Sequence, residues 1–125
     1  MPNFEDSYIG RLRKLAGSRK LILPGPRAAI TDDQGGLLLI RRCDNHEWAM
    51  PAGTMELEES VYGALQREVK EETGLDVLSA TLFAIYSDPR FGGVDGWGNH
   101  FQHLAFAFRV DEWAGTLLTA TDETV

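Results

Sequence analysis

Three glutamates in one short segment have the type and spacing of a divalent-metal site. Glu68, Glu71 and Glu72 stand at positions i, i+3 and i+4. At 3.6 residues per helical turn, this spacing places all three side chains on one face. Like charges at these spacings repel each other, and a bound cation would remove that repulsion. Because the ligands are charged oxygens only, the expected ion is a hard cation such as Mg²⁺ or Mn²⁺.

The segment around these glutamates reads as a tight loop followed by a helix. Apolar residues between Val61 and Val69 recur at i, i+3, i+4 and i+8, which is typical of a core-facing stripe. Gly74 follows as the expected left-handed C-cap. Gly53 lies in the preceding loop, where it lets the backbone approach a phosphate or the metal shell. The ordinary alternative for the glutamates is a solvated acidic surface.

The full spacing from Gly53 to Leu75 resembles the Nudix box, the signature of the Nudix hydrolase family. Five residues separate Gly53 from Glu59, and seven more separate Glu59 from the run REVKEETGL. The sequence departs mildly from the family pattern at Ala52 and Glu58, where glycine is common. The departures are in the loop and leave every charged position of the box in place.

The resemblance implies a role for each charged residue of the box. The metal ligands would be Glu68, Glu71, Glu72 and the upstream Glu59. Arg67 matches the arginine that holds a box carboxylate in place. The expected catalytic group is therefore Glu71, Glu68 and Arg67, with a box glutamate as general base. Gly53 and Gly74 are expected to be structural.

The resemblance also implies the fold, an α/β Nudix-type α/β/α sandwich around a mixed β-sheet. The box would form its loop–helix–loop. A chain of 125 residues has the length of one domain with a single core, so we expect one Nudix domain over residues 1–125. An amphipathic helix is expected at about residues 3–16. Strands are expected over residues 21–31, 37–42, 75–86 and 100–110, followed by a turn at 111–116.

The C-terminal part of the sequence is shorter than this family usually has. A Nudix domain usually continues with another strand and a closing helix, so we expect these elements to be missing or the sequence to be truncated. Family members often place an additional acidic residue near this region. Asp122 and Glu123 are the candidates for that acid.

Two further segments supply candidate substrate contacts. The strand over residues 37–42 ends in two arginines, which either face a diphosphate or are ordinary strand-end charges. The glycine-rich residues 87–99 read as a long binding loop, or else as a hairpin connection with exposed aromatics. The candidate substrate-binding residues are Arg41, Arg42, Arg90, Phe91 and Trp97.

Composition excludes several other classes of function. Twelve basic and 19 acidic residues give a net charge of −7, which argues against binding a nucleic-acid polymer. Cys43 is the single cysteine, so no intramolecular disulfide can form and a cytoplasmic location is expected. No apolar run has membrane-spanning length, so no membrane partner is expected. A homodimer is a further expectation, because members of the resembled family are often dimers.

The reaction implied by the resemblance is hydrolysis of a phosphoanhydride bond with Mg²⁺ or Mn²⁺ as cofactor. The substrate would be a nucleoside diphosphate linked to another moiety. Pro89 lies near a position where ADP-ribose hydrolases of the family carry proline, which favours ADP-ribose or a nucleotide sugar. One alternative is an antimutator-type pyrophosphohydrolase acting on nucleoside triphosphates. A non-catalytic nucleotide-binding module is the alternative of another class, although such modules commonly lose box carboxylates.

Overall fold

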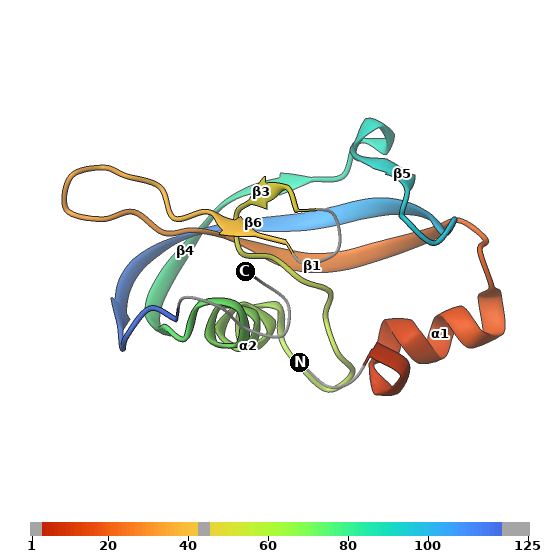
Figure 1. Ribbon diagram of the computed structural model, residues 1–125, viewed down its shortest axis with the longest axis horizontal. Helices are drawn as coiled ribbons and strands as arrows, with labels where there is room; N and C mark the ends of the chain where they lie inside the picture. The colour runs from red at the N-terminus through yellow and green to blue at the C-terminus, as the bar shows by residue number, and fades with distance from the viewer. Residues whose placement is uncertain (1–3, 43–45, 119–125) are drawn as a thin grey trace.

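The computed structural model describes residues 4–42 and 46–118 of the chain (Figure 1). Cys43, Asp122 and Glu123 lie outside these residues. The elements in chain order are η1 (Phe4–Asp6), α1 (Tyr8–Ala16), β1 (Leu21–Ala29), β2 (Ile40–Arg41), β3 (Trp48–Ala49), α2 (Val61–Thr73), β4 (Asp76–Tyr86), η2 (Pro89–Phe91), β5 (Gly92–Val94) and β6 (His100–Ala114).

The main sheet is mixed, as expected for the α/β fold. Strand β6 is central and pairs in parallel with β1 and antiparallel with β4. The short β5 also pairs antiparallel with β6, and β2 pairs with β3 in a separate two-stranded sheet. Helices α1 and α2 both lie on the same side of the main sheet in Figure 1.

The box helix α2 carries the apolar face that forms the core. Ser60 caps its N-terminus by accepting a hydrogen bond from the Gly63 amide, and Gly74 ends it with a φ of 82°. The predicted stripe packs on the sheet, with Leu65 and Val69 almost fully buried. The buried core cluster comprises Ala28, Ile30, Leu65, Val69, Leu75, Val77, Phe108 and Val110.

Strand β1 runs without a break through its two prolines, because it lies at the edge of the sheet. Proline has no amide hydrogen and is tolerated where no neighbouring strand needs one. The carbonyls of Pro24 and Pro26 still accept hydrogen bonds, from the amides of Met55 (3.0 Å) and Gly53 (3.3 Å). The prolines therefore occupy an edge of the sheet, and the box loop covers that edge.

The expected strand over residues 37–42 is largely absent. Only Ile40–Arg41 forms a strand, and its partner Trp48–Ala49 lies in a stretch expected to be loop. Leu37 and Leu39 are exposed and Ile40 is buried, so only part of this apolar run is covered by the rest of the protein.

Three other boundaries differ from expectation. The turn predicted at residues 111–116 is wrong. Strand β6 continues to Ala114, because this residue pairs with Asp76 at the start of β4. The predicted loop at residues 87–99 contains η2 and β5. The N-terminal helix starts at Tyr8 rather than residue 3, after the short turn of η1. No helix in the described part of the chain is long and apolar enough to cross a membrane.

Candidate active site

Arg67 is the centre of the charged cluster on the box helix. Its Nε and Nη2 donate to the two carboxylate oxygens of Glu59, each at 2.8 Å. Its Nη1 lies 2.6 Å from Glu68 Oε1 and 3.4 Å from Glu71 Oε2. Nη2 also donates to the Thr54 carbonyl at 3.1 Å. Such a two-pronged pairing fixes both position and orientation, so Arg67 joins the box loop to the helix.

The same pairing changes the protonation equilibria of both partners. The Arg67 guanidinium holds the pKa of the Glu59 carboxyl below its ordinary range, and this outweighs the opposing effect of burial. The hydrogen bonds to Glu59 in turn raise the pKa of Arg67. Glu59 is therefore ionised at neutral pH.

Glu68 lies directly against the box loop. Its side chain is buried, with the residue 2% exposed, and it packs on the backbone of Gly53. A Cβ atom at Gly53 would lie 2.1 Å from the Glu68 carboxyl carbon. The glycine thus makes room for the carboxylate itself, and this gives a physical reason for glycine at the first position of the box.

A Gly53→Ala variant tests this contact. Because the added methyl group would overlap Glu68, we expect the carboxylate to move and stability to fall by about 1–3 kcal/mol. Chemical denaturation measures the change in the free energy of unfolding. Gly96→Ala is the matched control, since a Cβ there meets no atom within 4 Å. Equal stability of the Gly53 and Gly96 variants would contradict the close packing.

Glu72 is the second buried carboxylate of the box, 4% exposed. Its Oε2 accepts a hydrogen bond from the Ala52 amide at 3.1 Å. Glu71, one residue earlier, is partly exposed and faces Arg67. The three predicted metal ligands of α2 therefore do not share one environment.

The donor set can be compared with the needs of a hard cation. Among residues 4–42 and 46–118, no three His, Cys, Asp or Glu side chains converge as ligands of one ion. Arg67 instead lies between the carboxylates of Glu59, Glu68 and Glu71. The donors nevertheless fit Mg²⁺ or Mn²⁺ in kind, and buried Glu68 and Glu72 both line one cavity.

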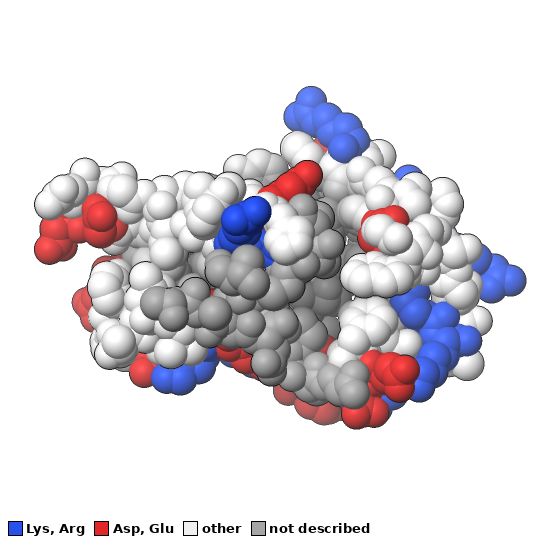
Figure 2. Space-filling model, viewed as in Figure 1, with Lys and Arg blue, Asp and Glu red and all other residues white. Residues whose placement is uncertain are grey.

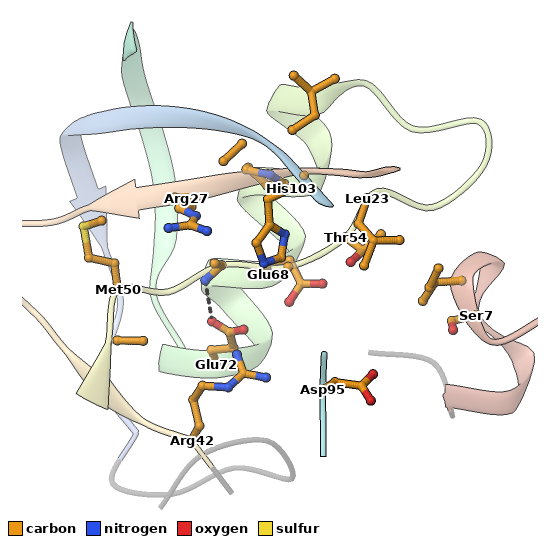
Figure 3. Close-up of a pocket in the computed structure, with 18 of the residues that line it drawn as sticks. Ser7, Leu23, Arg27, Arg42, Met50, Thr54, Glu68, Glu72, Asp95 and His103 are labelled. Atoms are coloured by element: carbon orange, nitrogen blue, oxygen red, sulfur yellow. Dashed lines mark hydrogen bonds between the residues drawn. The ribbon is translucent and has the colours of Figure 1, made fainter. Parts of the chain in front are cut away.

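That cavity has a volume of about 1050 Å³ and lies beside the box (Figure 3). This is at the upper end of the range for small-molecule sites, so it has room for a nucleotide. Parallel pairing of β1 with β6 sets Leu23 beside His103 and Gly25 beside Ala105, and all four line the cavity. Ala28, further along β1, belongs to the buried core instead.

Cations and buried carboxylates line the same cavity. Arg27 comes from β1 and Arg42 directly follows β2, and both line the cavity with His103 of β6. Figure 3 draws these three side chains around the cavity together with Glu68 and Glu72. Burial lowers the pKa of His103, and the charges of Arg27 and Arg42 lower it further. His103 is therefore neutral at pH 7, while the two arginines are charged.

The lowered pKa of His103 predicts a pH dependence of stability. The unfolded chain titrates this group near 6.5, whereas the folded chain holds fewer protons there. Stability is therefore expected to fall as the pH decreases below about 6.5, and His103→Gln should lose that dependence. Urea denaturation between pH 5 and 8 measures it, with His100→Gln, at an exposed position, as control. Parallel pH curves for the wild type and His103→Gln would contradict the prediction.

The candidate substrate residues divide into two groups. Arg42 and Trp97 line the cavity. Arg41, Arg90 and Phe91 are exposed and are not among the described residues that line it. Arg41 donates to the His46 carbonyl at 3.2 Å. Arg90 stacks on Phe91, with 5.1 Å between its guanidinium carbon and the ring centroid.

The sequence reasoning missed several cavity residues. Arg27 follows Pro26 inside an apolar strand, and His103 lies in the central strand β6; neither is among the candidate residues predicted from the sequence. Asp95 and Asn99 flank Trp97 in the tight turn between β5 and β6, and they line the same cavity. An isolated cation inside an apolar edge strand was the one available signal for Arg27.

Comparisons with known proteins show what this chain is similar to. The family model described as NUDIX domain matches residues 23–125. A "MutT-like protein" from Streptomyces ambofaciens is 34% identical over 95 residues, covering 76% of this chain and 55% of that protein. An "8-oxo-dGDP phosphatase" from Danio rerio is 37% identical over 76 residues, covering 60% of this chain and 20% of that protein. The chain thus spans about half the length of these curated relatives or less.

A solved structure of another protein has a similar fold. The MutT NUDIX hydrolase from Burkholderia pseudomallei superposes with a TM-score of 0.66 at 27% identity. The alignment covers 84% of this chain and 79% of that one. Residues 4–22, which include η1 and α1, precede the region that the family model matches.

Proposed function

Because this chain belongs to the Nudix hydrolase family, we propose that it hydrolyses a phosphoanhydride bond in a nucleoside diphosphate linked to another moiety, with a divalent metal ion as cofactor. One observation carries the proposal. Two arginines, Arg27 and Arg42, share a cavity with the buried carboxylates Glu68 and Glu72. Cations of this kind bind phosphate oxygens, and buried carboxylates bind a metal ion.

Each group of residues has its own role in the proposed hydrolysis. Arg27 and Arg42 hold the phosphates and offset their negative charge. Arg67 fixes Glu59 and Glu68, so that the box carboxylates keep their positions when charged groups approach. A bound Mg²⁺ or Mn²⁺ would supply charge neutralisation and a water of lowered pKa. Glu71 or Glu68 would then take the proton from the attacking water as general base.

A nucleoside triphosphate is the second candidate substrate. The first relative described above is named a MutT-like protein, which favours the antimutator-type alternative. The ADP-ribose alternative gains no such support from Pro89, because this residue is exposed and is not among the described residues lining the cavity. The cavity has room for either class.

The testing experiment is phosphate release across a panel of ADP-ribose, nucleotide sugars, nucleoside diphosphates and triphosphates, with a coupled phosphatase. We expect turnover of one class with Mg²⁺ or Mn²⁺, and none with EDTA. Turnover that persists in EDTA would overturn the role of the metal. A folded protein that binds these nucleotides and turns over none of them would instead be the non-catalytic module.

A further inference from the structure

The N-terminal segment outside the family match, η1 and α1, forms one wall of the active-site cavity. Phe4, Ser7 and Ile9 all line it. Figure 3 places Ser7 on the side of the cavity away from Arg42 and Arg27, with Leu23 and Thr54 between them. A segment that precedes the matched domain thus completes the site.

The box loop holds the start of α1 in place. The amide of Tyr8, in the first turn of the helix, donates to Glu56 Oε1 at 2.9 Å. The Glu56 amide in turn donates to Glu59 Oε1 at 2.9 Å, and Glu59 is the partner of Arg67. A negative side chain at a helix N-terminus stabilises the helix, because it interacts favourably with the helix dipole. Through Glu56 and Glu59, the contact also links α1 to the charged cluster around Arg67.

The end of α1 is held by the central strand. Arg13 Nη2 donates to the His100 carbonyl at 2.8 Å, and its Nη1 donates to the Arg19 carbonyl at 2.6 Å. The His100 amide donates to the Ser18 carbonyl at 3.1 Å. Burial raises the pKa of Asp95, but hydrogen bonds from Asn99 and Trp97 together outweigh it. The charge of Arg13 lowers this pKa further, so the net shift is downward. The helix therefore lies beside the turn that carries Trp97.

The wall segment is internally fixed as well. Ser7 is fully buried, and its hydroxyl donates to the Phe4 carbonyl at 2.6 Å and accepts from the Gly10 amide at 3.0 Å. A Cβ atom at Gly10 would lie 1.7 Å from the Phe4 carbonyl oxygen. The backbones of η1 and the first turn of α1 are therefore in direct contact, which limits their relative movement.

The side chains at this end of the cavity differ in chemistry from those at the arginine end. Phe4, Ile9 and Leu23 are apolar, and the 75%-exposed Trp97 adds an aromatic surface. Asp95 Oδ1 accepts the amides of Trp97 at 2.9 Å and Asn99 at 3.0 Å, which fixes the turn that presents the tryptophan. Figure 2 shows Lys and Arg side chains gathered on the surface over α1.

We infer that η1 and α1 form the base-binding wall of the site, with Ile9 as a specificity-determining residue for the heterocyclic base. The arginine end then takes the phosphates. An apolar wall in a cavity that an aromatic side chain also lines favours a flat heterocycle over a sugar or a second phosphate. The inference rests on the proposed function for the identity of the ligand class.

The test measures binding without turnover. Isothermal titration with EDTA compares nucleoside monophosphates with ribose 5-phosphate, which has the same phosphate and sugar without the base. We expect the wild type to bind at least one nucleoside monophosphate about tenfold more tightly. Ile9→Trp, which fills this end of the cavity, should bring that ratio close to one. Affinity for inorganic pyrophosphate should stay unchanged.

Two more variants keep the test decisive. Ile9→Ala keeps a good helix former and should lower the same ratio without blocking the cavity. Leu15→Ala, at an 84%-exposed position of the same helix, should leave the ratio unchanged. A wild type that does not distinguish the two ligands, or Ile9 variants that match Leu15→Ala, would overturn the inference.

Failure of the proposed function gives a different result. If the base-dependent ratio holds but no panel compound is hydrolysed with Mg²⁺ or Mn²⁺, the base-binding wall stands and the hydrolase does not. If turnover is observed but the ratio is one, the hydrolase stands and the base-binding wall does not.

Discussion

The Glu71→Gln variant is expected to lose metal-dependent turnover by on the order of 10²–10⁴-fold, with an unchanged fold. Glutamine keeps the shape of the side chain but removes the charge and the basic oxygen. Glu71 is partly exposed, and its contact with Arg67 is long at 3.4 Å, so little stability depends on it. Steady-state kinetics on the preferred substrate measures the loss, and the melting temperature should move by less than about 2 °C.

The matched control for this experiment is Glu58→Gln. It makes the same chemical change at an exposed position in the loop of the box. We expect its turnover to stay within about twofold of the wild type, because surface substitutions usually have small effects. If Glu71→Gln keeps the activity of the control, then Glu71 is neither a metal ligand nor the general base. The buried pair Glu68 and Glu72 would then have to supply the site.

The box could be predicted from the sequence because its information is local. Helix periodicity, the N-cap and the C-terminal glycine lie within one continuous segment, so α2 needs no knowledge of the remaining chain. The same holds for the role of Arg67, whose charged partners all belong to the box. For Gly53 the sequence predicts an approach to a phosphate or the metal shell, whereas in the structure this glycine makes room for the Glu68 carboxylate.

The cavity could not be predicted, because its walls come from distant segments. Arg27 and His103 line one cavity because β1 pairs in parallel with β6, and a single sequence does not reveal the register of that pairing. The wall formed by α1 depends on Glu56, 48 residues from its partner Tyr8. The short strands β2 and β3 failed for a similar reason, since their pairing relies on tertiary context rather than on local propensity.

Residue type alone does not determine the backbone structure at two places in this chain. The apolar run at residues 37–42 is expected to form one strand, yet Leu37 and Leu39 are exposed and only Ile40–Arg41 forms a strand. Glu58 stands where glycine is common and adopts a φ of 66°, a conformation that side chains other than glycine rarely take. Glu58 therefore adopts a backbone conformation that glycine takes more readily.

The Arg67→Met variant is expected to lower the free energy of unfolding by about 3–5 kcal/mol, the largest stability effect predicted for this chain. Methionine fills a similar volume but removes the guanidinium that pairs with Glu59 and buried Glu68. A buried carboxylate without its cation carries an uncompensated desolvation cost. Urea denaturation at pH 7 measures the loss. Lys70→Met, on the same helix, breaks an exposed pair with Asp76 and should cost less than about 1 kcal/mol.

The pH dependence shows whether the effect is electrostatic. In the wild type, Glu59 has a pKa below its ordinary value of 4.5, so its stabilisation is present above that pH and is lost as the pH falls. The difference between the wild type and Arg67→Met should therefore narrow below about pH 4.5. A difference that stays constant down to pH 3 would show that Arg67 stabilises the fold through packing of its side chain. Its pairing with Glu59 would then orient the box loop without adding to the free energy of unfolding.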